Sequence, residues 1–266
     1  MRANLFSDYA DFLRTSSSVD LAREIDAPQR LRLDVDRVGA KALEVAYAPF
    51  DHVNTQARIV IVGITPGRQQ MCAALTEAQR QLKAGTAEAE ALSRAKVHAS
   101  FAGPMRANLV AMLDEVGIAA HLGLETAAAL WGRDSDMVHF TSALRYPVFV
   151  DGANYSGAPD MLATPMLRRH LMSWFAVEAA QLPEALYVPL GDKVADAVEA
   201  AMEAAGVKRA RILRGLPHPS GANAERIAYF LGRKARAALS AKVNPDRLDV
   251  ARATLQAQVA GFRGRA

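Results

Sequence analysis

The sequence predicts an α/β fold, a three-layer α/β/α sandwich around a central, mainly parallel sheet of four strands. Short β-branched runs alternate with longer stretches of helical periodicity along most of the chain. The first core run, residues 58–64, has no polar–apolar alternation, which is typical of a strand covered on both faces. A chain of 266 residues that is 51% hydrophobic is also large enough to bury one sizeable core.

Residues 1–56 are predicted to form an N-terminal extension packed on the core. A first helix is indicated by apolar side chains at helical spacing, namely Leu5, Tyr9, Phe12 and Leu13. A polar run at residues 16–18 ends that helix. Residues 30–35 alternate between apolar and polar side chains, which predicts one strand in the extension.

The core domain is expected over residues 57–240. Its four strands are predicted at residues 58–64, 137–144, 185–190 and 210–213. Its helices are predicted at residues 68–99 with a break at Gly85, 106–116, 194–205 and 224–239. Residues 241–266 are expected to add an amphipathic helix over 245–260 and a basic tail.

Composition excludes several classes of protein. Cys72 is the only cysteine, which excludes a disulfide within the chain and any multi-cysteine zinc or iron–sulfur centre. No apolar run approaches the roughly 18 residues of a membrane span, and Asp8 comes too early for a signal peptide. We therefore expect a soluble cytoplasmic protein. The net charge of +4 permits a polyanionic partner without demanding one.

Two loops follow predicted strands at the edge where parallel sheets bind ligands. Residues 63–67 read Gly-Ile-Thr-Pro-Gly; Pro66 is stiff and Gly67 lets a ligand approach the backbone, but an ordinary turn is the simpler interpretation. In residues 217–221, two prolines flank His218, and Ser220 and Gly221 offer a hydroxyl and an amide to an anion. A rigid surface turn explains this second loop equally well.

Taken together, the two loops resemble the two active-site motifs of the uracil-DNA glycosylase superfamily. Three segments between them also resemble that superfamily in order and spacing: residues 101–104 (Phe-Ala-Gly-Pro), 140–147 and 187–195. The resemblance covers about residues 57–240. It implies a uracil-DNA glycosylase-like fold and hydrolysis of the N-glycosidic bond of a flipped uracil, or another deaminated or damaged base, in DNA.

The resemblance also implies site residues. His218 matches the donor to the departing base, and Thr65 stands where the superfamily holds the attacking water. Phe101 matches the stacking aromatic and Ser142 the base-reading position, with Gly63 and Ile64 beside them. The remaining matches are DNA- or phosphate-binding positions: Pro66, Gly67, Ser220, Gly221 and Asn223. No metal, metal cluster or cofactor is implied; we expect a monomer whose partner is single-stranded or damaged duplex DNA.

Three departures from the superfamily pattern support a second hypothesis. The pKa of the Thr65 hydroxyl is far too high for this group to act as a general base. The short Ser142 side chain cannot pair with two atoms of uracil without help from Arg145, Asn154 or Asn223. Ala222 replaces an apolar wedge. The chain is therefore either a monofunctional glycosylase or a catalytically inactive nucleobase- or nucleic-acid-binding protein of the same fold. A minor third hypothesis is an unrelated α/β enzyme acting on a small molecule.

Overall fold

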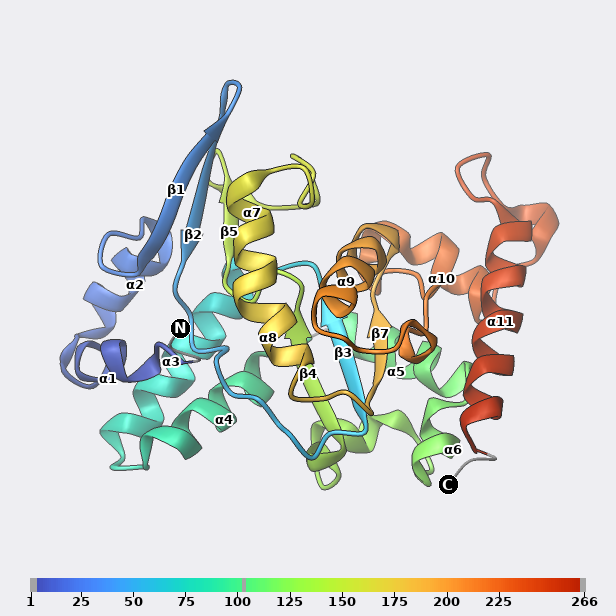
Figure 1. The fold of residues 1–266 in the computed structure, drawn as a ribbon, viewed down its shortest axis with the longest axis horizontal. Coiled ribbons are helices and arrows are strands. Elements are labelled where there is room, and N and C mark those ends of the chain that lie inside the picture. The colour runs from blue at the N-terminus through green and yellow to red at the C-terminus, as the bar shows by residue number, and fades with distance from the viewer. Residues whose placement is uncertain (1–3, 102–103, 264–266) are drawn as a thin grey trace.

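A parallel sheet lies at the centre of the molecule (Figure 1). The computed structural model describes residues 4–101 and 104–263. The sheet has three strands in the order β4 (Val138–Ser142), β3 (Ile59–Gly63) and β7 (Leu186–Pro189). Every residue of β3 is buried, as its unbroken apolar run predicts for a central strand.

Helices cover both faces of this sheet. Successive β3 side chains point to opposite faces, so they pack into two different core clusters. Val60 and Val62 belong to one core cluster, and Ile59 and Ile61 belong to the other. The first cluster includes side chains from α3 (Arg68–Lys83), α4 (Glu88–Ala99), α7 (Pro165–His170), the π-helical turn Leu171–Ala176, α8 (Val177–Ala179) and α9 (Asp192–Ala204). The second includes side chains from α5 (Pro104–Glu115), α6 (Ile118–Leu122), α10 (Ala224–Phe230) and α11 (Pro245–Arg263). The mixed α/β class is confirmed.

Of two predicted helical segments, one breaks where expected and the other ends early. The break expected at Gly85 within residues 68–99 is confirmed, since it separates α3 from α4 and Gly85 has φ +80°, as a residue ending a helix often does. The helix expected at residues 224–239 ends early, since α10 stops at Phe230 and Gly232 takes φ +68°. Residues 236–238 form only a 3₁₀ turn.

The expected fourth strand of the parallel sheet, residues 210–213, is reduced to a single parallel bridge between Ile212 and Tyr187. The reason is local. Residues 209–211 form a 3₁₀ turn, in which the Arg211 and Ile212 amides donate to carbonyls three residues earlier, so they are not available to a β-ladder. Only Leu213 then donates to the carbonyl of Tyr187, at 2.7 Å.

A second sheet, which the sequence analysis did not predict, joins the N-terminal residues to the core. Its order is β1 (Arg32–Val38), β2 (Lys41–Ala46), β5 (Val148–Val150) and β6 (Ala153–Asn154), and its pairs are antiparallel. The predicted strand at 30–35 corresponds to β1, which pairs with the unpredicted β2. Pairing of β2 with β5, for example Leu43 with Val150, links the extension to residues more than 100 positions away.

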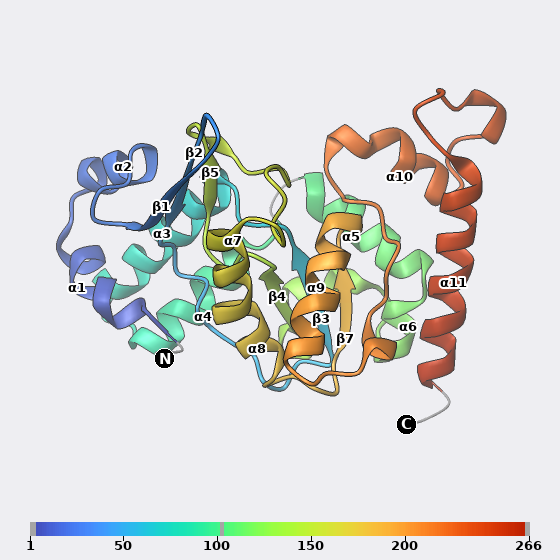
Figure 2. The same cartoon turned by 45° about the horizontal axis from the view of Figure 1, so that its top comes forward.

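The extension, with α1 (Phe6–Thr15) and α2 (Ser18–Asp26), lies beside α3 and α4 at one end of the long axis (Figure 2). The helices α10 and α11 lie at the other end. Across the described ranges, no helix has both the length and the apolar character needed to cross a lipid bilayer. The carboxyl ends of the parallel strands lie between these two ends of the molecule.

Candidate functional site at the carboxyl ends of the parallel strands

A cleft of about 850 Å³ opens where β3 and β7 end. Ile64 borders it directly after β3, and Leu190 and Gly191 border it directly after β7. The predicted loop at 217–221 supplies another part of its wall, with His218 among the lining residues. Residues of α11 line the cleft as well. The two loops singled out in the sequence therefore meet at one cleft, through Ile64 and His218.

The His218 loop is held from two directions. The Asn108 side chain on α5 donates to the carbonyl of Pro219 at 2.9 Å, and the Gly191 amide donates to the carbonyl of Leu216 at 3.2 Å. Gly191 has φ +96°, a conformation that favours glycine, and a β-carbon there would lie 3.8 Å from Cβ of His218. Hydrogen bonds from two other segments therefore hold the backbone on both sides of His218.

Hydrogen bonding assigns the proton on the neutral His218 ring. The backbone amide of Ser220 donates to Nδ1 at 3.3 Å, so Nδ1 is an acceptor and Nε2 carries the hydrogen. Burial lowers the pKa of His218 below its ordinary value, which favours this neutral form at pH 7. Within the described part of the chain Nε2 has no hydrogen-bond partner. His218 thus offers a neutral N–H donor to a ligand in the cleft.

Three of the predicted base-binding residues form a second group beside the end of β3. Gly63 pairs with Ser142 across β3 and β4, and a β-carbon on Gly63 would lie 3.3 Å from Oγ of Ser142 and 3.5 Å from Cζ of Phe101. Only glycine fits this approach without displacing a neighbour. Phe101 has φ +49°, which is uncommon for a side chain of its size. Because β3 is the middle strand, this group lies on the β4 side and His218 on the β7 side.

The space next to this second group is small. Its volume is about 20 Å³, and Pro66, Phe101, Ser142 and Arg145 are among the residues that line it. That volume holds about one water molecule and not a nucleobase. Phe101 is only 6% exposed, and its ring lies 5.9 Å from that of Phe140. A base could stack on Phe101 only after that ring moves. Ala102 and Gly103 of the predicted stacking segment lie outside the described residues.

Thr65 does not fit its predicted role. Its side chain is buried, and its hydroxyl donates to the carbonyl of Tyr146 at 3.0 Å and accepts from the amide of Val148 at 3.1 Å. These two bonds attach the turn after β3 to the start of β5. The single hydrogen of the hydroxyl is therefore given to a backbone carbonyl, so this group cannot donate to a water held against a sugar.

The predicted phosphate-binding residues divide into two sets. At the first loop Pro66 is buried, the Gly67 amide donates to Gln70 at 3.2 Å, and the Arg68 amide donates to Asn154 at 2.9 Å. Those amides are thus occupied by side chains of the same molecule.

The second loop is more open. Gly221 and Ala222 are exposed, and Ser220, Ala222 and Asn223 line the cleft. The Asn223 side chain donates to Oγ of Ser220 at 3.4 Å and accepts from Arg226 at 2.9 Å. The 217–221 loop, rather than the 63–67 loop, therefore presents polar groups to a ligand in the cleft.

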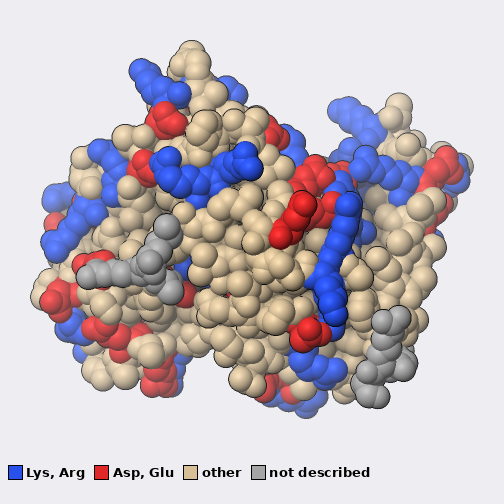
Figure 3. Space-filling view, viewed as in Figure 1, with Lys and Arg blue, Asp and Glu red and all other residues tan. Residues whose placement is uncertain are grey.

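The charged lining of the cleft was not identified from the sequence. Four basic residues line it: Lys193, Arg226, Lys242 and Arg247. Asp192 is the one acidic residue among the described lining, and its carboxylate lies 2.7 Å from Arg247. Figure 3 shows basic and acidic side chains mixed where the upper ends of α9, α10 and α11 lie. No local pattern could have brought Arg247 here, because α11 reaches the cleft only through tertiary packing.

A buried network of charges lies on the side of β4, apart from the cleft. His139 Nε2 contacts Glu178 at 2.6 Å, and Arg145 Nη2 contacts the other carboxylate oxygen at 2.7 Å. Burial alone would raise the pKa of Glu178, but attraction to Lys96 and Arg145 outweighs it and holds that pKa well below the ordinary value. Arg145, expected to help Ser142 read a base, is thus bound to Glu178.

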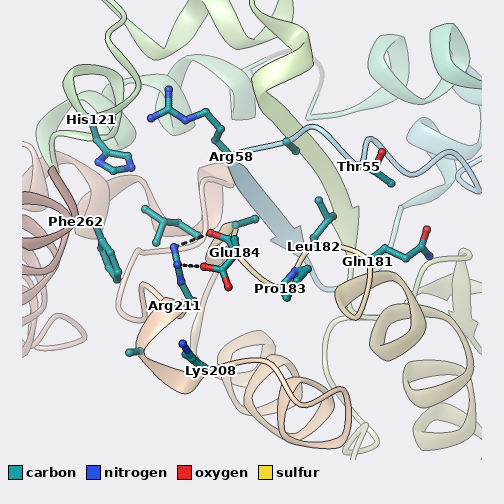
Figure 4. Close-up of a pocket in the computed structure, with 14 residues that line it drawn as sticks. Thr55, Arg58, His121, Gln181, Leu182, Pro183, Glu184, Lys208, Arg211 and Phe262 are labelled. Atoms are coloured by element: carbon teal, nitrogen blue, oxygen red, sulfur yellow. Dashed lines mark hydrogen bonds and ion pairs between the residues drawn. The ribbon is translucent and has the colours of Figure 1, made fainter. Parts of the chain in front are cut away.

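A further cavity of about 420 Å³ lies at the opposite, amino end of the strands (Figure 4). Arg58, directly before β3, and Lys208 are among its lining residues, and Arg211 forms an ion pair there with Glu184. None of the predicted site residues lines it. Within residues 4–101 and 104–263, no group of three or more His, Cys, Asp or Glu side chains is placed to hold a metal ion.

Comparison with known proteins identifies one relative. No family model matches the chain, and no solved structure matches it. Over 192 residues the chain is 38% identical to a Bacillus subtilis (strain 168) protein named "Uncharacterized protein YoxB". The match spans 71% of this chain and 75% of the relative. The chain belongs to the same protein family as YoxB.

Proposed function

We propose that this protein is an N-glycosyl hydrolase with a uracil-DNA glycosylase-like fold, acting on a flipped uracil or another deaminated or damaged base in DNA. The observation that carries the proposal is the neutral His218, with Nδ1 bound to the Ser220 amide and Nε2 free for a ligand. The sheet is interpreted as the four-stranded sheet of that fold, its last strand shortened to the Ile212–Tyr187 bridge.

His218 would act on the leaving group. When an N-glycosidic bond breaks, the departing base takes up negative charge, and an N–H donor placed at the charged oxygen stabilises it. Such a donor is worth roughly 3–4 kcal/mol of transition-state energy. A neutral imidazole whose other nitrogen is held by the Ser220 amide can donate without losing its proton.

The basic lining of the cleft supports a polyanionic substrate. The four cations outnumber the single carboxylate, so phosphates of a DNA strand would be attracted to the cleft. The exposed Ala222, which directly follows the 217–221 loop, is a poor wedge, which favours single-stranded or damaged DNA over an intact duplex.

A second candidate function is a nucleobase- or nucleic-acid-binding protein without hydrolytic activity. One observation favours it: the Thr65 hydroxyl, at the position expected to hold the attacking water, is committed to backbone groups. Without a group that activates water, the protein would bind a base and release it unchanged. The two candidates differ in whether a product forms.

The test is an abasic-site cleavage assay on single- and double-stranded oligonucleotides that carry uracil, hypoxanthine, xanthine or hydroxymethyluracil. We expect abasic product from the wild type and a loss of about 10²–10³-fold in rate for His218→Ala. His121→Ala is the matched control, because His121 lines the cavity at the opposite end of the strands. This control should keep the wild-type rate.

The outcomes separate the hypotheses. If no base gives product but oligonucleotide binding survives His218→Ala, the binding protein is supported and the hydrolase is rejected. If the wild type neither cleaves nor binds any oligonucleotide, both the hydrolase and the nucleic-acid-binding protein are rejected. An enzyme acting on a small molecule would then be the better explanation of the cleft.

A further inference from the structure

A separate cavity of about 240 Å³ lies beside β4, outside the site described above. In the strand order β4-β3-β7, β4 is an edge strand, and α4 contributes another part of the cavity wall. Lys96 and Ser93 line it from α4, His139 from β4, and His52 and Asn54 from the segment before β3. It shares only Phe140 with the small space beside Phe101.

Lys96 is the unusual group in this cavity. Its side chain is only 2% exposed, and its ammonium donates to the backbone carbonyl of His52 at 2.6 Å. An ammonium has three hydrogens to donate, and among the described residues no other acceptor and no carboxylate within 4.0 Å is recorded for Lys96. Buried charges in proteins are normally in direct contact with an opposite charge, and no carboxylate of the described residues contacts this one.

The nearby carboxylate is already engaged. Glu178 influences Lys96 electrostatically, but its Oε1 contacts His139 and its Oε2 accepts from Arg145. Burial lowers the pKa of Lys96 to about 8, with Glu178 opposing that shift, so the ammonium form still predominates at pH 7. The cavity is therefore bordered by a positive charge that the protein does not neutralise by direct contact.

The other groups around the cavity favour an acceptor-rich ligand. Burial and the charge of Lys96 lower the pKa of His52 to about 4, so His52 is neutral at pH 7 and carries one N–H. No partner within the described chain is recorded for that ring or for the hydroxyl of Ser93. The one acidic lining residue, Asp136, is exposed to solvent.

We propose that this cavity binds a small oxyanion, the carboxylate or phosphate group of a compact molecule, with Lys96 as its counter-ion and His52 and Ser93 as further donors. The volume equals that of about eight water molecules, which limits the ligand to roughly ten non-hydrogen atoms. This site is independent of the proposed glycosylase activity, because none of these three residues lines the His218 cleft.

The test compares thermal unfolding and calorimetric binding of the full chain in inorganic phosphate, acetate and chloride at equal ionic strength. We expect phosphate or acetate, but not chloride, to raise the wild-type melting temperature, and the anion that does so identifies the ligand group. Lys96→Met should weaken binding roughly tenfold to a hundredfold, because it removes a charged hydrogen bond. The same variant should also be less stable than the wild type in chloride, because it removes the attraction between Lys96 and buried Glu178. Binding is therefore read from the anion-specific shift alone.

A purely structural role for Lys96 predicts a different result. If Lys96 serves only to hold the carbonyl of His52 and to offset the charge of Glu178, the wild type will show no anion-specific shift. Either an absent wild-type shift or an unchanged shift in Lys96→Met overturns the proposal.

Two further variants guard against ambiguity. If Lys96→Met does not fold, Ser93→Leu decides the question: leucine at this half-buried wall position should fill the cavity and abolish the anion-specific shift. A shift that survives Ser93→Leu overturns the proposal. Arg247→Ala, in the His218 cleft, should keep the shift; if it is lost there, the anion binds in that cleft and the proposal is wrong.

Discussion

The His218 and His139 rings have similar hydrogen bonds at Nδ1 and different surroundings at Nε2. In each ring Nδ1 accepts a backbone amide, from Ser220 at 3.3 Å and from Asn54 at 3.4 Å. Burial lowers the pKa of both side chains, that of His139 to about 4. The difference is at Nε2, which contacts Glu178 at 2.6 Å in His139 and borders the cleft in His218. Burial and a fixed tautomer are common to both rings, whereas only His218 has an Nε2 with no partner among the described residues, so only that ring can donate to a ligand.

The surroundings of the two rings follow the same division. His139 contacts Glu178, which also forms an ion pair with Arg145. These contacts hold α8, where Glu178 lies, against β4, where His139 lies. His218 lies in a loop that two elements hold from outside. Mutations around His139 should therefore act on folding, and mutations around His218 on ligands.

The largest effect is expected from Glu178→Gln, which leaves Arg145 buried without its carboxylate and removes the attraction that Glu178 exerts on Lys96. Removing one partner of a buried ion pair costs about 3–5 kcal/mol of unfolding free energy. Urea titration of the variant measures this loss. His218→Ala should change the unfolding free energy by less than about 1 kcal/mol, as is usual away from buried networks. A Glu178→Gln variant as stable as the wild type would contradict the structural role of the His139 region.

The next effect is a loss of stability as the pH falls from 6.5 towards 4. The pKa of His139 is about 4 in the folded protein and near 6.5 in an unfolded chain, so only the unfolded state binds a proton in this range. The contribution of neutral His139 to the free energy of unfolding is fully present above pH 6.5. Proton uptake by the unfolded chain removes roughly 3 kcal/mol of this contribution by pH 4. Urea titrations across this pH range measure the slope.

A matched variant isolates the contribution of His139 to this slope. His139→Gln should flatten the pH dependence without abolishing it, since the pKa of His52 is also lowered to about 4. His218→Ala should alter the slope less, because that ring is only half-buried. An unchanged slope in His139→Gln would mean that other groups control acid unfolding.

The smallest effect is expected at Thr65. Like His139, and unlike His218, its polar side chain is bonded to other parts of the protein. Thr65→Val leaves the carbonyl of Tyr146 and the amide of Val148 without their partner, at a cost of about 1–3 kcal/mol. Thr65→Ser keeps both bonds and should lose less. Urea titration and the abasic-site assay are run together on both variants. A Thr65→Val protein of full stability but without activity would restore the catalytic role predicted from the sequence.

Some features were predictable because they depend on the local chain. The unbroken apolar run at 58–64 predicts a strand buried on both faces, and β3 is one. Gly85 predicts the helix break between α3 and α4. Parallel strands also place their following loops at one edge, which explains why Ile64 and His218 meet at one cleft.

Other features depend on contacts that no local pattern records. β2 and β5 pair across more than 100 residues, and the strands involved are short. The 3₁₀ turn at 209–211 uses amides that the predicted fourth strand needed. The direction of the Thr65 hydroxyl was equally hidden, because its partners Tyr146 and Val148 lie about 80 residues further along the chain.

The α/β class, the central buried strand and the edge at which its loops gather were predictable from the sequence, because hydrophobic periodicity and glycine conformation act within a few residues. Which polar groups remain available for a ligand depends on tertiary packing. Glu178 contacts His139 and Arg145, whereas among the described residues Nε2 of His218 has no partner and the ammonium of Lys96 has no carboxylate in direct contact, since side-chain pairing depends on distances between elements that only packing sets.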